Sequence, residues 1–177
     1  MKFLLYLVMF ILLLNGFATA QSLIRHSCKK ASANDPKLKY DFCVKSLKEH
    51  PQSKTAKSLE ELVFASTKNA VSKTISLKEM VNKILKEDKY EVETPLRNCL
   101  ELYTGAIDFL NQSLDTVKSR DYKVATMLMS SAMDATGDCE SGYTKRKKPL
   151  KSPFTKENDV LFHMVLIPIA FTNMLDI

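Results

Sequence analysis

The positions of the four cysteines constrain the fold of this chain more than any other feature. The first two, Cys28 and Cys43, lie equally far from the dipeptide Asp35-Pro36. Aspartate followed by proline favours a turn, so the chain is expected to reverse direction there. A disulfide between the two cysteines would then hold an antiparallel helical hairpin together.

The other two cysteines repeat this arrangement further along the chain. Cys99 and Cys139 lie equally far from Ser119, which stands at a break between two helical patterns. Four cysteines allow three pairings, and the sequence alone does not choose among them. Only nearest-neighbour pairing matches both turns, and we therefore expect the bridges Cys28–Cys43 and Cys99–Cys139.

The N-terminal segment 1–20 has the composition of a secretory signal peptide. Lys2 precedes an apolar run from Phe3 to Leu14, and the segment ends on the small residues Ala18-Thr19-Ala20. Signal peptidase accepts such an end, so the mature chain is expected to begin at Gln21. A membrane anchor is the alternative, but the run is short for a span of about 20 apolar residues. Secretion would also supply the oxidising compartment that the disulfides require.

The expected mature chain, residues 21–177, has the length of one domain with a single core. Loss of Lys2 with the signal peptide lowers the net charge from +6 to +5. This modest basic excess suits an acidic protein surface or a polyanionic matrix as a partner. A nucleic acid is not expected, because no arginine-rich patch with interleaved aromatic residues occurs.

Helical spacing recurs along the mature chain, whereas strand patterns are nearly absent. Residues 55–88 contain neither Gly nor Pro. Thr94-Pro95 is typical of a helix start, and Asp121 can cap a further helix that Gly142 would end. Thr155 can begin the last helix.

Apolar and small residues three and four positions apart give each predicted helix one inward face. Pro168 is expected to interrupt the last helix, either by a kink or by loosening its second half. The residues expected to face inward are Leu59, Val63, Ser66, Ala70, Thr74, Leu77, Val81 and Ile84, then Leu96, Cys99, Tyr103, Ala106, Leu110, Leu114 and Val117, then Val124, Leu128, Ser131, Ala132, Ala135 and Cys139, and finally Leu161, Met164, Val165, Ile169, Thr172 and Leu175.

The predicted fold is all-α, an up-and-down four-helix bundle over residues 55–177 with an N-terminal helical hairpin over residues 21–50 and two disulfides. Short connections between the four long helices favour antiparallel neighbours. The segment from Ile24 to Leu47 is expected to form a hairpin separate from the bundle.

Patterns that carry catalysis or bind metals are lacking. His26, His50 and His163 lack the spacing to Cys, Asp or Glu that a zinc site requires. No nucleophile elbow, P-loop or dinucleotide fingerprint occurs. We therefore expect no catalytic residue, no metal and no cofactor, and His163 is expected to be a packed helix residue.

The segments around the cysteines resemble the plant invertase and pectin methylesterase inhibitor family. The similarity covers essentially all of residues 21–177, and it is strongest to the pollen-allergen members described as invertase inhibitors. Its most specific marks are Tyr40-Asp41-Phe42 before Cys43, Asn98-Cys99 with Tyr103, and Ser130-Ser131-Ala132 ahead of Cys139.

The resemblance implies a secreted inhibitor that docks one-to-one over the substrate cleft of a carbohydrate enzyme in the cell wall (the apoplast) or the vacuole. Family members directed at invertase carry a Pro-Lys-Phe motif, and the matching positions here are Tyr122, Lys123 and Val124. The lysine is kept and both flanks differ, which favours pectin methylesterase (pectinesterase) as the partner. Acid invertase (beta-fructofuranosidase) is the alternative, which the similarity to pollen allergens supports.

Two interpretations from other classes stay open. One is a non-inhibitory bundle that binds a small apolar ligand, although the small residues from Ala125 to Ala135 indicate tight packing instead of a cavity. The other is a structural protein with no enzyme target.

Two surface features complete the prediction. The loop Lys145-Arg146-Lys147-Lys148 is either a solvated connector or an electrostatic contact to de-esterified pectin. Asn111-Gln112-Ser113 is a glycosylation sequon. The mature protein is expected to be a monomer free of membranes, although a dimer could exchange the N-terminal hairpin.

Overall fold

The computed structural model describes residues 2–87 and 93–176, and within the first 18 residues it describes the side chain of Tyr6 alone. Most side chains of the expected signal peptide therefore lie outside the described residues. Every element in the described part is a helix and no strand occurs there, so the all-α prediction is confirmed. The elements are α1 (Lys2–Asn34), α2 (Tyr40–Glu49), the 3-10 helix η1 (Pro51–Thr55), α3 (Leu59–Lys86), α4 (Glu93–Lys118), α5 (Tyr122–Thr144) and α6 (Thr155–Asn173).

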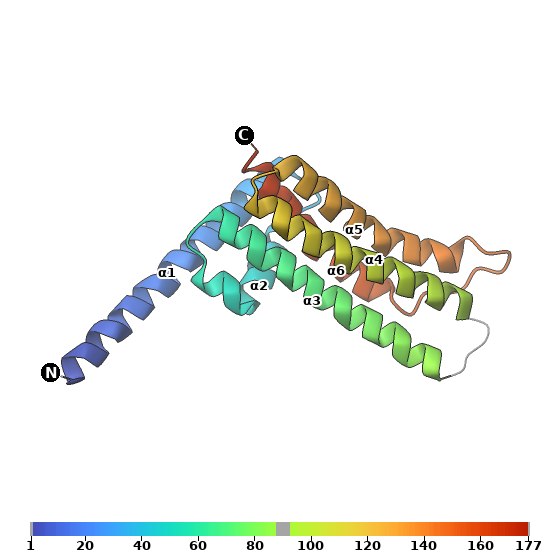
Figure 1. Ribbon diagram of the computed structural model, residues 1–177, viewed down its shortest axis with the longest axis horizontal. Helices are drawn as coiled ribbons and strands as arrows, with labels where there is room; N and C mark the ends of the chain where they lie inside the picture. The colour runs from blue at the N-terminus through green and yellow to red at the C-terminus, as the bar shows by residue number, and fades with distance from the viewer. Residues whose placement is uncertain (1, 88–92, 177) are drawn as a thin grey trace.

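Helices α3 to α6 form the predicted antiparallel four-helix bundle (Figure 1). Both α3 and α5 pack against α4 and against α6, so each helix has two neighbours around one core. Of the described helices, none is long and apolar enough to cross a membrane. The largest fully buried side chains include Tyr103, Tyr143, Phe154, Phe171, Leu62, Leu77, Leu96, Leu110, Met129 and Leu161.

Side-chain caps mark the starts of α3 and α5, whereas α2, η1 and α6 begin without one. Ser58 precedes α3 and its hydroxyl accepts the N–H of Glu61 at 3.1 Å, an arrangement typical of an N-cap. Asp121 caps α5, and α6 begins at Thr155, both as predicted. Helix α4 begins at Glu93, two residues before Pro95, the predicted first helical residue.

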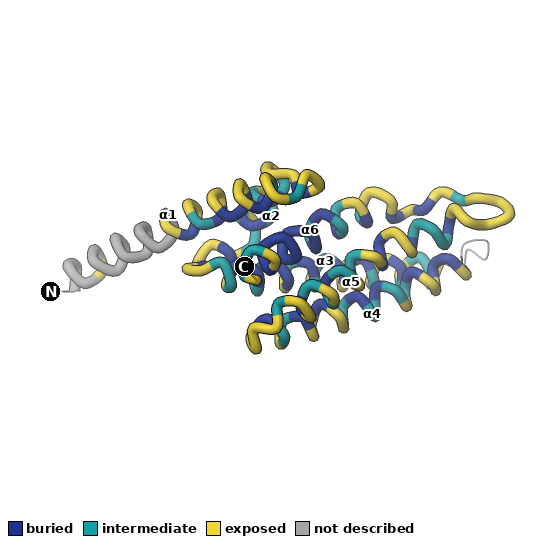
Figure 2. The backbone as a smooth tube through the Cα atoms, turned by 90° about the horizontal axis from the view of Figure 1, so that it is seen from above, coloured by how far each residue is buried: buried dark blue, intermediate teal, exposed yellow. Residues whose placement is uncertain are grey.

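The second half of α6 is buried on all sides, since residues 165–172 are all buried. A helix that is apolar all round needs partners on every side. Figure 2 shows α6 between the hairpin of α1 and α2 and the rest of the bundle. The ring of Phe42 in α2 lies 5.5 Å from that of His163 in α6. The predicted N-terminal hairpin is therefore present, formed by α1 and α2, and its buried residues belong to the same core as those of the bundle.

Two details of the predicted helices differ in the structure. Helix α6 is one continuous helix through Pro168 to Asn173, so the proline does not divide it. The hydroxyl of Thr172 donates to the carbonyl of Pro168 at 2.7 Å within the continuing helix. Helix α5 runs past Gly142 to Thr144. A Cβ atom at position 142 would lie 3.1 Å from Nδ2 of Asn98, so this glycine serves the close approach of α5 to α4.

Both disulfides join neighbouring helices. Cys28 in α1 is bonded to Cys43 in α2, with 5.8 Å between the Cα atoms. Cys99 in α4 is bonded to Cys139 in α5, with 4.8 Å between the Cα atoms. This is the nearest-neighbour pairing, and all four cysteines are fully buried.

Candidate functional site

The candidate partner-binding residues Tyr122, Lys123 and Val124 form the first turn of α5. Lys123 and Val124 are exposed, whereas Tyr122 is half-buried and packs against the core. The carboxylate of Asp121 accepts the N–H of Val124 at 3.2 Å. The helix therefore begins in a fixed geometry and presents the lysine to solvent.

The turn before this site is tight. Arg120 has a φ of 60°, in the left-handed region. Its N–H donates to the carbonyl of Val117 at 3.0 Å, and the N–H of Asp121 donates to that of Thr116 at 2.9 Å. These two bonds close the end of α4 in the manner of a Schellman motif. They offset the roughly 1–2 kcal/mol that the left-handed conformation costs a residue other than glycine.

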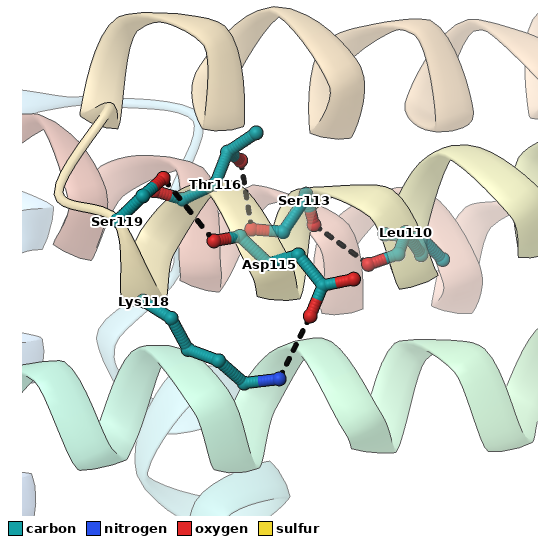
Figure 3. A network of polar contacts seen from close by, with 6 residues as sticks. All are labelled: Leu110, Ser113, Asp115, Thr116, Lys118 and Ser119. Atoms are coloured by element: carbon teal, nitrogen blue, oxygen red, sulfur yellow. Dashed lines mark hydrogen bonds and ion pairs between the residues drawn. The ribbon is translucent and has the colours of Figure 1, made fainter.

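Side-chain hydrogen bonds hold the last turns of α4 next to the candidate site (Figure 3). The hydroxyl of Thr116 donates to the carbonyl of Ser113 at 2.9 Å, and that of Ser119 donates to the carbonyl of Thr116 at 3.0 Å. The Nζ atom of Lys118 lies 2.7 Å from Oδ1 of Asp115. The ammonium group of this neighbouring lysine is therefore already paired.

Lys123 differs from Lys118 in this respect. Among the described residues no carboxylate forms an ion pair with it. An exposed ammonium is a compact point charge with three donors. Lys123 can therefore pair with a carboxylate of a partner without first breaking an internal salt bridge.

Two exposed apolar side chains accompany Lys123 on α5, Val124 at 38% and Met127 at 67% exposure. The sequence pattern missed this surface, because it placed Val124, Leu128 and Ser131 on the inward face. The structure leaves Val124 and Ser131 exposed and Leu128 half-buried. The buried face of α5 is formed instead by Ala125, Met129, Ala132, Ala135, Thr136, Cys139 and Tyr143.

A buried polar network lies near the other end of α5. The hydroxyl of Tyr103 in α4 donates to Oδ1 of Asn158 in α6 at 2.6 Å. Nδ2 of Asn158 and the hydroxyl of Thr155 donate to the carboxylate of Glu140 in α5, at 2.7 and 2.8 Å. Burial raises the pKa of Tyr103, so its hydroxyl stays a neutral donor. The network joins three helices and is structural.

The loop Lys145-Arg146-Lys147-Lys148 is exposed and follows the C-terminal end of α5, away from Lys123 (Figure 1). The structure thus does not bring the two basic features together. Asn111 is exposed on α4, but Ser113 of its sequon is buried and donates to the carbonyl of Leu110 at 2.7 Å. Attachment of a glycan would therefore have to precede folding.

The isolated histidines do not form a site. His163 is 8% exposed in α6, and burial and Lys39 lower its pKa, against a smaller opposing effect of Asp159. Burial and Lys68 likewise lower the pKa of His50. In the part of the chain that the structure describes, no three His, Cys, Asp or Glu side chains are placed to hold a metal ion.

Comparison with known proteins gives consistent results. The sequence profile of the family described as "Plant invertase/pectin methylesterase inhibitor" matches residues 22–171. The protein "Pectinesterase inhibitor 12" of Arabidopsis thaliana is 53% identical over 176 residues, which cover 99% of this chain and 100% of that protein. The protein "Putative invertase inhibitor" of Platanus orientalis is 33% identical over 160 residues, which cover 90% and 93% of the two chains.

Two solved structures show the same fold at low sequence identity. The crystal structure of a pectin methylesterase inhibitor from Arabidopsis thaliana has a TM-score of 0.61 at 18% identity, covering 87% of this chain and 96% of that one. A mutant form A of a pectin methylesterase inhibitor from Arabidopsis has a TM-score of 0.65 at 19% identity, covering 76% and 89%.

Proposed function

Because the chain belongs to the plant invertase/pectin methylesterase inhibitor family, we propose that it is a secreted plant protein that inhibits pectin methylesterase by binding one-to-one over the cleft of the enzyme. The full-length identity of 53% to Pectinesterase inhibitor 12 is the observation that carries this choice of target. The protein is an inhibitor and not itself an enzyme.

Acid invertase is the second candidate target. It is supported by the 33% identity to the Platanus orientalis protein named "Putative invertase inhibitor" and by Lys123, which has no internal ion pair among the described residues. In that case the ammonium of Lys123 would pair with carboxylates of the enzyme, and Val124 and Met127 would supply apolar contact beside it. For pectin methylesterase, the sides of the bundle helices would cover the cleft and Lys123 would contribute little.

The proposal includes processing and location. Residues 1–20 would be removed as a signal peptide, and residues 21–177 would form the inhibitor domain, with the hairpin over 21–50 and the bundle over 55–177. The mature protein would act as a monomer in the cell wall, with the vacuole as the second destination. A weak electrostatic contact with pectin would be made by residues 145–148.

A paired inhibition assay tests the choice of target. Oxidised mature protein is titrated against a plant pectin methylesterase and an acid invertase at mildly acidic pH. We expect loss of methylesterase activity near one equivalent, with invertase unaffected and with Lys123→Ala as active as the wild type. Lys83→Ala, an exposed lysine of α3, is the matched control.

The other outcomes separate the two targets. Inhibition of invertase that Lys123→Ala abolishes and Lys83→Ala preserves would establish invertase as the target and overturn the methylesterase proposal. Inactivity of the wild type against both enzymes would contradict an inhibitory function.

A further inference from the structure

The connection between α5 and α6 carries an unusual concentration of positive charge. It contains no acidic residue between Glu140 and Glu157. It projects beyond the ends of both helices, and it is exposed along most of its length (Figures 1 and 2). Its five cationic residues are Lys145, Arg146, Lys147, Lys148 and Lys151, and Lys156 follows in the first turn of α6; all six are exposed. We call residues 145–156 the basic tip.

The base of the basic tip is fixed to the bundle. The N–H of Leu150 donates to the carbonyl of Tyr143 at 3.0 Å. The buried hydroxyl of Ser152 accepts the N–H of Phe154 at 3.1 Å. The ring of Phe154 is fully buried, with its centroid 6.4 Å from that of Tyr103 and 6.5 Å from that of Tyr143. The cations are therefore held at one end of the bundle and do not belong to a free tail.

The charge of the basic tip is not neutralised by the acids that flank it. Glu140 accepts hydrogen bonds from Thr155 and Asn158, and Glu157 pairs with Lys73 of α3. Within residues 2–87 and 93–176, no ion pair involves any of the six cations. Glu140 and Glu157 are thus engaged by other partners, whereas the exposed Asp159 lines a pocket together with Lys151 and Lys156. The field that extends into solvent is therefore mainly that of Lys145, Arg146, Lys147 and Lys148.

The side chains around these cations favour an acidic polysaccharide as the partner over an acidic protein surface or a nucleic acid. Phe154 is buried and Leu150 half-buried, so the basic tip exposes no aromatic side chain. A stable protein interface requires buried apolar or aromatic anchors, and single-stranded nucleic acids stack their bases on aromatic rings. A polysaccharide with repeated carboxylates needs only a row of accessible cations.

We propose that the basic tip binds de-esterified pectin, a polyuronate. This inference deepens the proposed function and, in its regulatory part, rests on it. Hydrolysis of a pectin methyl ester leaves a carboxylate on the polymer and releases methanol and a proton. The polymer therefore becomes anionic where the methylesterase has acted, and the basic tip concentrates the inhibitor there. Inhibition is directed to the places where product accumulates.

Retention on immobilised polygalacturonate, in a salt gradient and without any enzyme, tests the binding. The loop variant Lys145→Gln, Arg146→Gln, Lys147→Gln, Lys148→Gln is compared with a variant of equal charge, Arg25→Gln, Lys29→Gln, Lys30→Gln, Lys37→Gln. The four control residues are exposed on the hairpin. The wild type and the control variant should elute together and the loop variant at lower salt. The slope of log affinity against log salt should become shallower by on the order of 2 to 3, since each contact to a single-stranded polyanion contributes about 0.7.

Several results would overturn the proposal. Elution of the loop variant with the wild type, or equal losses in both variants, would mean that the basic tip is not the binding surface. Equal retention on fully methyl-esterified pectin would exclude recognition of carboxylates. Stronger retention on polyglutamate than on polygalacturonate would assign the surface to an acidic protein.

The inhibition assay shows whether the protein inhibits the methylesterase even if the basic tip does not bind polyuronate. In high salt, the loop variant should inhibit the methylesterase at the same stoichiometry as the wild type. Binding to polygalacturonate without inhibition would leave the polyuronate surface intact and contradict only the enzyme target.

Discussion

At the scale of single residues, the hydroxyl of Tyr103 joins α4 to the network around Asn158 and Glu140. Removing it by Tyr103→Phe leaves Oδ1 of the buried Asn158 without its donor, 2.6 Å away in the wild type. An unsatisfied buried acceptor costs about 1–3 kcal/mol, so the free energy of unfolding should fall by that amount. Urea denaturation measures the change.

Tyr40→Phe is the control for this prediction. Tyr40 is exposed at the start of α2, and no hydrogen bond involves its hydroxyl among the described residues. The control should unfold at the same urea concentration as the wild type. Equal stability of Tyr103→Phe would show that the network does not stabilise the bundle.

His163 should make stability depend on pH. Its pKa is lowered in the folded protein from 6.5, the value of the unfolded chain, mainly by burial and then by Lys39. Below about pH 6.5 the unfolded state therefore binds protons before the folded state does, and the free energy of unfolding decreases until the pH passes the folded pKa. His50 acts in the same direction, because burial and Lys68 lower its pKa as well.

The variant His163→Phe keeps the aromatic contact with Phe42 and removes the titrating group. Its free energy of unfolding should change less between pH 7.5 and pH 5 than that of the wild type. His26→Phe, at an exposed position of α1, is the control and should retain the dependence of the wild type. If the free energy of unfolding of His163→Phe changes with pH as much as that of the wild type, the pH dependence comes from other groups.

At the scale of elements, the two disulfides should contribute differently to the free energy of unfolding and should stabilise different helices. In the chain-entropy model, the Cys28–Cys43 bridge, which closes 15 residues, contributes roughly 3 kcal/mol, and the Cys99–Cys139 bridge, which closes 40, contributes roughly 4 kcal/mol. The double variant Cys28→Ala, Cys43→Ala should loosen the hairpin that covers α6. Hydrogen exchange should then accelerate in α1, α2 and the side of α6 beneath them.

Cys99→Ala, Cys139→Ala is the contrasting variant. It should lower the global free energy of unfolding and accelerate exchange throughout α4 and α5, since this bridge joins two bundle helices. Identical exchange patterns in the two double variants would contradict the assignment of the first bridge to the hairpin.

Helices α5 and α6 show which parts of the fold the sequence can predict. The predicted inward face of α3 is correct from Val63 to Val81, because the charged residues and the buried residues lie on different sides of this helix. In α5 the predicted face is correct at Ala132, Ala135 and Cys139. In its first half the face is displaced by one residue, because small and apolar residues occur there on more than one side of the helix.

The candidate site was predictable only in part. The position of Lys123 in a first helical turn follows from the cap at Asp121, which local chemistry reveals. The engagement of Glu140 and Glu157 inside the bundle depends on packing between distant segments, so the sequence could not show that the basic tip lacks internal partners. The same holds for the hairpin on α6, since a helix apolar on every side does not indicate which side meets which partner.

At the scale of the whole molecule, hairpin and bundle should behave as one cooperative unit, because their buried residues belong to one core. Deleting residues 21–55 of the mature chain would expose the apolar side of α6. We expect this variant to bind the dye ANS and to lose its cooperative unfolding transition, measured by fluorescence and thermal melting. A deletion variant that stays compact and melts cooperatively would show that the bundle is an independent domain.

The burial of α6 has a consequence for biosynthesis. A chain made from its N-terminus completes α3, α4 and α5 before the segment that fills the space between them exists. Cys28 and Cys43 lie before the bundle in the chain, whereas the bundle stays open until Thr155–Asn173 has been made. Closure of the bundle therefore waits for α6, and premature termination before α6 would leave an incomplete bundle.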